Sequence, residues 1–147
     1  MGYNEIMAIP SDKINQISKM LIMHNIKLAY LFGSQSTGKT KPNSDIDIAV
    51  FFNSSVNQAE ADTLRLDIMQ KITNITNNDA VDVVPLSKAP ILLKFKILKD
   101  RKILVDQKPA ERVMFEHKVM SSYFDRKYYI DRHSKSALNR FANKGIS

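Results

Sequence analysis

The chain has 147 residues, of which 44% are hydrophobic and 25% charged, and its net charge is +7. This length indicates a single domain that can bury a core without disulfide bonds or structural metals. The sequence contains no cysteine, which excludes thiol catalysis and Cys-based zinc sites. No apolar run approaches the about 20 residues that span a bilayer, and the first residues lack the pattern of a signal peptide, so we expect a cytoplasmic protein.

Four strands and four helices are expected along the chain. Apolar periodicity predicts strands over residues 26–32, 46–52, 81–86 and 102–105. It predicts helices over 11–24, 57–74, 90–99 and 109–129, the first capped by Ser11 and the last burying Val113, Met120 and Phe124. We expect one domain over residues 1–131 and a basic tail over 132–147, in the α/β (α+β) class.

The loop after the first strand reads GSQSTGKT over residues 33–40 and matches the phosphate-binding loop of many ATPases. In those proteins the Lys and Ser/Thr open a helix. Here Lys39 and Thr40 are followed by Pro42, which disfavours helix at Lys41, and then by the next strand. The context therefore argues against a P-loop.

Two acids lie at the start of the second strand, Asp45 and Asp47. Period-two alternation places both side chains on one face, where ionised carboxylates repel each other unless a cation joins them. Oxygen ligands suit Mg²⁺. A lone D-x-D pattern is weak, and a turn-ending Asp45 with an exposed Asp47 remains the alternative. If the first two strands pair, Gly33 and Ser34 lie beside these acids, because they follow the first strand.

A third acid, Asp82, lies inside the apolar run of the third strand. A buried charge is costly unless it is paired or binds a metal. The alternative is an acid that faces outward from a half-exposed strand.

Together these residues resemble the signature of the nucleotidyltransferase superfamily related to DNA polymerase β. Gly33-Ser34 is followed, after ten residues, by Asp45-Ile46-Asp47, with Ser44 before the first acid and Asp82 in a later strand. The chain looks most like the minimal nucleotidyltransferase (MNT) domain proteins. That resemblance implies a small mixed sheet flanked by helices, with a C-terminal helix. Many relatives have an Arg where this chain has Thr37, which puts full activity in doubt.

The resemblance implies Mg²⁺-dependent transfer of AMP from ATP to a hydroxyl group. It assigns metal binding and catalysis to Asp45, Asp47 and Asp82. It assigns nucleotide binding to Gly33, Ser34, Ser44 and Lys39.

Small stand-alone MNT proteins are similar to the antitoxin of HEPN/MNT toxin–antitoxin pairs, in which the antitoxin adds AMP to a tyrosine of the HEPN ribonuclease. We therefore expect a cognate HEPN toxin as partner in a hetero-oligomer, no membrane association, and no favoured role for nucleic-acid binding. The C-terminal segment fits a docking role, because aromatic residues lie among basic ones, namely Tyr123, Phe124, Tyr128 and Tyr129. Two alternatives remain open: transfer to a small molecule such as an aminoglycoside, and an antitoxin that acts by binding alone.

Overall fold

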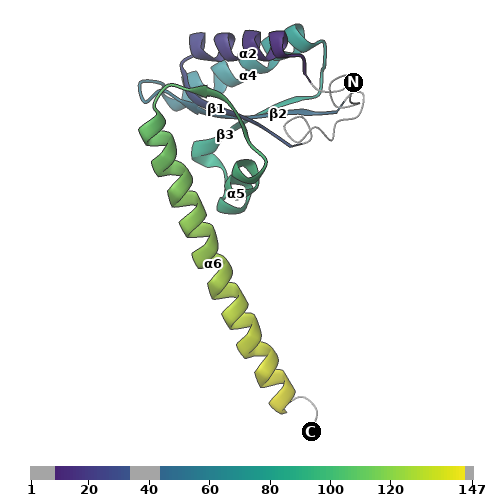
Figure 1. The fold of residues 1–147 in the computed structure, drawn as a ribbon, viewed down its shortest axis with the longest axis vertical. Helices are drawn as coiled ribbons and strands as arrows, with labels where there is room; N and C mark the ends of the chain where they lie inside the picture. The colour runs from purple at the N-terminus through teal and green to yellow at the C-terminus, as the bar shows by residue number, and fades with distance from the viewer. Residues whose placement is uncertain (1–8, 34–43, 145–147) are drawn as a thin grey trace.

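A four-stranded sheet with helices on both faces forms the body of the protein (Figure 1). The computed structural model describes residues 9–33 and 44–144. The strands are β1 (Ile26–Phe32), β2 (Ile46–Phe52), β3 (Val81–Pro85) and β4 (Lys102–Asp106), in the order β3-β2-β1-β4. β1 runs antiparallel to both β2 and β4, whereas β2 and β3 are parallel. The predicted mixed sheet is thus confirmed.

Two helices, α2 (Ser11–Met23) and α4 (Gln58–Thr76), cover one face of the sheet. Their predicted apolar stripes are buried there, and Ile17, Leu21 and Ile72 are fully inaccessible to solvent. The predicted cap at Ser11 is wrong, since Ser11 is the first helical residue and follows Pro10, with no side-chain capping bond.

The opposite face carries a short 3₁₀ helix η1 (Leu86–Lys88), helix α5 (Ile91–Lys99) and the first turns of helix α6 (Pro109–Lys144). α5 packs against α6, where the ring of Phe95 stacks on that of Tyr123 with centroids 3.6 Å apart. Phe115 meets Phe51 of β2 edge to face. These contacts form a second apolar layer beneath the sheet.

Helix α6 has 36 residues and projects far beyond the body of the protein (Figure 1). At a rise of about 1.5 Å per residue it is about 54 Å long. It continues past the predicted end near residue 129, because no Gly or Pro follows Pro109 until Gly145. None of the described helices is both long and apolar enough to cross a membrane.

The prediction of which α6 residues are buried was partly wrong. Val113 and Phe124 are 54% and 55% exposed, whereas Val119 is 3% exposed. The stripe that contacts the sheet and α5 runs through Phe115, Val119 and Tyr123, each one helical turn after the last. Tertiary packing therefore buries a different side of α6 from the one that apolar periodicity predicted.

Candidate active site

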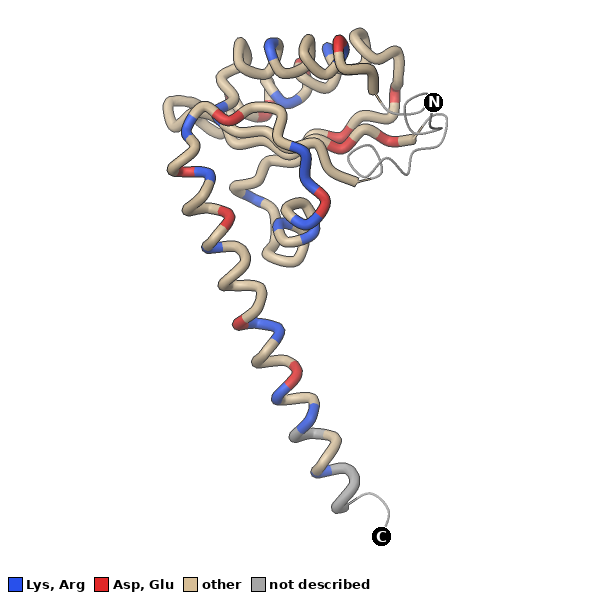
Figure 2. The backbone as a smooth tube through the Cα atoms, viewed as in Figure 1, with Lys and Arg blue, Asp and Glu red and all other residues tan. Residues whose placement is uncertain are grey.

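The predicted acids come together at one end of the sheet. Asp45 directly precedes β2, and strand register places Asp47 opposite Asp82 of β3 on one side and opposite Phe32 of β1 on the other. Paired residues of neighbouring strands share a face, so Asp47 and Asp82 lie on the face opposite α2 and α4. Figure 2 shows acidic positions of neighbouring strands side by side at this end.

Gly33 brings the backbone against Asp47. Its φ of +72° lies in the left-handed region, and a Cβ built there would lie 2.8 Å from Asp47 Oδ2. A side chain at this position would be strained by its backbone and would also collide with the carboxylate. The local geometry therefore requires the glycine that the sequence motif has at position 33.

Asp47 is held in an environment that disfavours its charge. Burial raises the pKa of the Asp47 carboxyl, and the neighbouring Asp45 and Asp82 raise it further, while Lys96 of α5 lowers it. A bound cation would relieve both the burial and the repulsion.

Asp82 follows the alternative interpretation, an acid that faces outward from a half-exposed strand, and not that of a buried charge. Its side chain is 56% exposed and pairs with Arg65 of α4, Nη2 to Oδ1 at 3.3 Å. Because β3 is an edge strand, the burial argument for this acid does not apply. Sequence reasoning missed Arg65, although its place on the border of the apolar α4 stripe, four residues after Ala61, was a usable signal.

The start of β2 is fixed by the turn before β3. The side-chain amide of Asn78 donates to the Ser44 carbonyl at 2.9 Å and accepts from Ala80 N at 2.8 Å. Ile46 N then donates to the Ala80 carbonyl at 2.8 Å. These bonds position Asp45 between two anchored neighbours. Ser34, Thr37, Lys39 and Lys41 lie outside the described residues.

The donor set fits magnesium in part. Asp45 and Asp47 offer the hard oxygen ligands that Mg²⁺ prefers, and this ion commonly takes one or two carboxylates together with substrate phosphates. Within residues 9–33 and 44–144, no three His, Cys, Asp or Glu side chains are gathered closely enough to hold a metal. The geometry therefore fits a metal that is completed by nucleotide.

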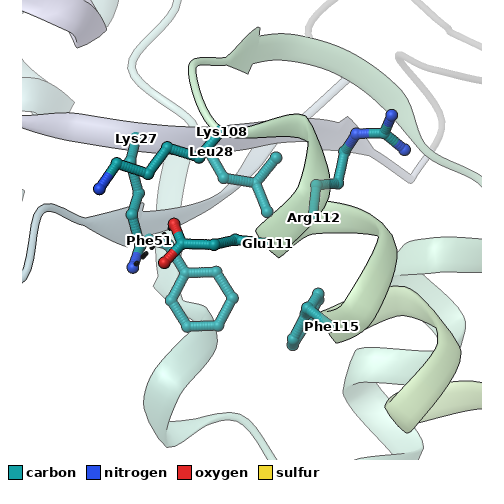
Figure 3. A pocket seen from close by; sticks show the side chains of 7 residues that line it. All are labelled: Lys27, Leu28, Phe51, Lys108, Glu111, Arg112 and Phe115. Atoms are coloured by element: carbon teal, nitrogen blue, oxygen red, sulfur yellow. Dashed lines mark ion pairs between the residues drawn. The ribbon is translucent and has the colours of Figure 1, made fainter.

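A cavity of about 110 Å³ lies at the other end of β1 and β2. Figure 3 shows Phe51 and Phe115 on its wall, with Lys27, Glu111 and Arg112 of the surrounding elements. Ligand pockets usually have volumes of about 300 Å³ or more, and this cavity is lined by neither Asp45 nor Asp47 nor Asp82. It is therefore not the candidate nucleotide site.

Comparison with known proteins agrees with this geometry. A toxin–antitoxin crystal structure with AMP-PNP superposes with a TM-score of 0.67 at 28% identity, covering 85% of this chain and 98% of that chain. A structure of tri-AMPylated Shewanella oneidensis HEPN toxin in complex with MNT antitoxin contains a chain that superposes at 0.64 with 25% identity, covering 87% of this chain and 98% of its own.

Sequence comparison gives the same assignment. The protein adenylyltransferase MntA of Shewanella oneidensis (strain MR-1) is 35% identical over 115 residues, which cover 74% of this chain and 76% of the relative. The family model for polymerase beta nucleotidyltransferases matches residues 15–110, a range that contains Gly33, all three acids and Arg65. The chain therefore belongs to the polymerase β nucleotidyltransferase family, and it is a nucleotidyltransferase enzyme.

Proposed function

We propose that this enzyme transfers AMP from ATP to a tyrosine of a cognate HEPN ribonuclease toxin and thereby acts as its antitoxin. The observation that carries the proposal is the pair Asp45 and Asp47, with the pKa of Asp47 raised beside the close backbone of Gly33. The relative named protein adenylyltransferase MntA supports the reaction class. The structure that contains a tri-AMPylated HEPN toxin supports the acceptor.

Asp45 and Asp47 would hold Mg²⁺, and Asp82 would offer it a further oxygen. When bound, the metal neutralises charge on the attacking and leaving oxygens of the phosphoryl group. Ionised Asp47 is disfavoured by burial and by its neighbours, so binding of a cation relieves an unfavourable charge. The site is thereby poised for a metal–nucleotide complex.

The reaction is a displacement at the α-phosphorus of ATP. The tyrosine oxygen forms the new bond, the bond to pyrophosphate breaks, and Asp82 accepts the hydroxyl proton. Gly33 has no side chain, so its backbone can approach the triphosphate closely. Ser34, Ser44 and Lys39 stay in the proposal as nucleotide-binding residues, with hydroxyl donors and one positive charge.

The projecting half of α6 is the proposed docking surface for the toxin. Large apolar side chains here are at least half exposed: Phe124, Tyr128, Tyr129, Ile130 and Leu138. Between residues 125 and 144 the helix carries six basic residues against two acidic ones. This charge opposes pairing with a second copy and favours an acidic, partly apolar face of the toxin. Isolated helices are marginally stable in water, so a partner would also stabilise this segment.

The test uses purified enzyme, purified cognate toxin, Mg²⁺, and ATP labelled in turn at the α- and γ-phosphates. We expect α-label on the toxin, release of pyrophosphate, and a mass increase in AMP units on a tyrosine-containing peptide. Asp47→Asn should show no transfer while still binding the toxin. Undiminished transfer by this variant would contradict the assignment of the acids.

A second candidate, an antitoxin that acts by binding alone, is favoured by Thr37 in place of the Arg of many relatives. A tight complex without transfer of α-label by the wild-type protein would select this candidate. Transfer to an aminoglycoside but not to the toxin would select the small-molecule alternative.

A further inference from the structure

Arg65 makes two bonds to neighbouring groups of β3. Its Nε donates to the Val83 carbonyl at 2.6 Å, and its Nη2 donates to Asp82 Oδ1 at 3.3 Å. One guanidinium thus joins the backbone of the strand to the carboxylate of the preceding residue.

The backbone bond makes Arg65 a fixed reference point. β3 lies at the edge of the sheet and pairs with β2 alone, and an edge strand leaves backbone groups without a strand partner. Nε supplies a donor to one of its carbonyls, so the guanidinium keeps its place relative to Asp82. A planar guanidinium can make both bonds at once, whereas a lysine ammonium is a point charge on a flexible stem.

Asp82 needs such a reference point. Its side chain is 56% exposed, and an unheld exposed carboxylate samples several rotamers. It also lies in register with Asp47, so repulsion between the two acids would drive it away from the site. Arg65 opposes this movement with a positive charge and a directed bond.

We propose that Arg65 is the positioning residue for Asp82. It holds Oδ1 at the sheet edge and leaves Oδ2 as the oxygen that faces the reaction. The inference rests on the proposed function, in which Asp82 accepts the acceptor proton and offers an oxygen to the metal.

Arg65→Lys is the discriminating variant, because it keeps the charge and loses the fork. At saturating Mg²⁺, we expect kcat for AMP transfer to fall about tenfold to a hundredfold, as for other residues that orient an active-site group, with the KM for ATP unchanged. Arg65→Gln should lose as much as Arg65→Lys. Full activity of Arg65→Lys would overturn the proposal.

Arg101→Lys is the matched control. Arg101 also bonds a backbone carbonyl, that of Leu98 at 2.7 Å, and a carboxylate, that of Glu116 at 2.9 Å, which is not one of the three acids of the site. If Arg65 were merely structural, both lysine variants would lower the Tm and activity in parallel. We expect a loss of kcat in Arg65→Lys alone.

A second readout does not depend on activity. Binding of Mn²⁺ in the presence of saturating AMP-PNP, measured by calorimetry, should weaken about tenfold in Arg65→Lys, because a free Asp82 must be ordered when the metal binds. In an Asp82→Ala background, Arg65→Lys should have no further effect. An equal weakening in both backgrounds would show that Arg65 does not act through Asp82. Absence of AMP transfer by the wild-type protein would refute the proposed function and leave this metal-binding test valid.

Discussion

At the scale of single residues, Asp47 links stability to function. Its pKa in the folded protein lies above the usual value of an aspartate carboxyl, first because of burial and then because of the neighbouring Asp45 and Asp82. Above the raised pKa, the ionised carboxylate lowers the free energy of unfolding. That penalty fades as the pH falls through the raised pKa towards the unfolded value. A site that binds a cation is therefore less stable when it is empty.

We expect Asp47→Asn to raise the Tm at neutral pH while it abolishes AMP transfer. The difference in Tm from wild type should shrink as the pH falls through the raised pKa of Asp47 towards the ordinary Asp value of about 3.9, below which the carboxyl becomes protonated in both the folded and the unfolded state. Thermal unfolding across this pH range checks the prediction. Asp62→Asn, at an exposed position of α4, is the control and should change the Tm little.

Gly33 gives the second prediction at this scale. Gly33→Ala should lower the free energy of unfolding by about 1–3 kcal/mol, because alanine is strained at positive φ, and the new methyl group would displace Asp47. Urea unfolding should show the lower stability, and the rate of AMP transfer should fall. Asn77→Ala is the control, since Asn77 also has a positive φ of 58° but caps α4. It should lose stability and keep its activity; equal kinetics in the two variants would contradict the role of Gly33.

At the scale of elements, one partly buried carboxylate connects α6 to the sheet. Glu116 accepts from Tyr30 of β1 at 2.9 Å, from Arg101 at 2.9 Å and from Arg112 at 2.8 Å. Burial and the bond to Glu116 raise the pKa of Tyr30, so its hydroxyl stays a donor. These bonds connect α6 to β1 and to the residue before β4.

Glu116→Gln should lower the free energy of unfolding by about 2 kcal/mol, because two arginines lose a charged acceptor that is only 13% exposed. Urea unfolding measures the loss. Glu111→Gln is the control: its side chain is 55% exposed and 3.9 Å from Lys27, so the change should stay within about 0.5 kcal/mol.

The projecting half of α6 should contribute to toxin binding and not to the stability of the folded protein. Tyr128→Ala removes a side chain that is 66% exposed. We expect affinity for the toxin to fall about fivefold or more, as at other aromatic interface positions, with the Tm unchanged. Met23→Ala on α2, where Met23 is 82% exposed, is the control in the same calorimetric titration. Equal affinities of both variants would place the interface elsewhere.

At the scale of the whole molecule, the candidate active site and the proposed docking surface are separated. The acids lie where β1 ends and β2 begins, whereas α6 follows β4 at the end where β1 starts. α6 then extends away from the sheet (Figure 1). In the proposed function, a toxin bound to α6 would therefore have to extend back past α5 to bring its tyrosine to Asp82.

The distribution of charge leads to a prediction about salt. The chain has a net charge of +7, and its projecting helix is basic, so long-range attraction should accelerate encounter with an acidic toxin surface. The association rate constant should fall about tenfold or more between low and physiological ionic strength, with a smaller change in the dissociation rate. Stopped-flow measurement checks this. A rate that does not depend on salt would contradict an electrostatic docking surface.

The local patterns of the sequence by themselves determined the order of elements and most of the acidic site. Alternation of apolar residues predicted the strands, and apolar stripes predicted α2 and α4. Gly33 and the two acids Asp45 and Asp47 lie close together in the fold, as their spacing predicted, because β1 and β2 are adjacent antiparallel strands. Such features depend on near neighbours in the chain.

Tertiary structure alone decided the rest. The strand order places β3 at an edge of the sheet, where Asp82 is exposed. There it accepts a hydrogen bond from Arg65, a residue of α4 that is 17 positions away in the sequence. Packing of α6 against the sheet and α5 buries the side of the helix that contains Val119 and leaves the side chain of Phe124 half exposed. These outcomes depend on which elements become neighbours in space, and hydrophobic periodicity within one segment carries no information about that choice.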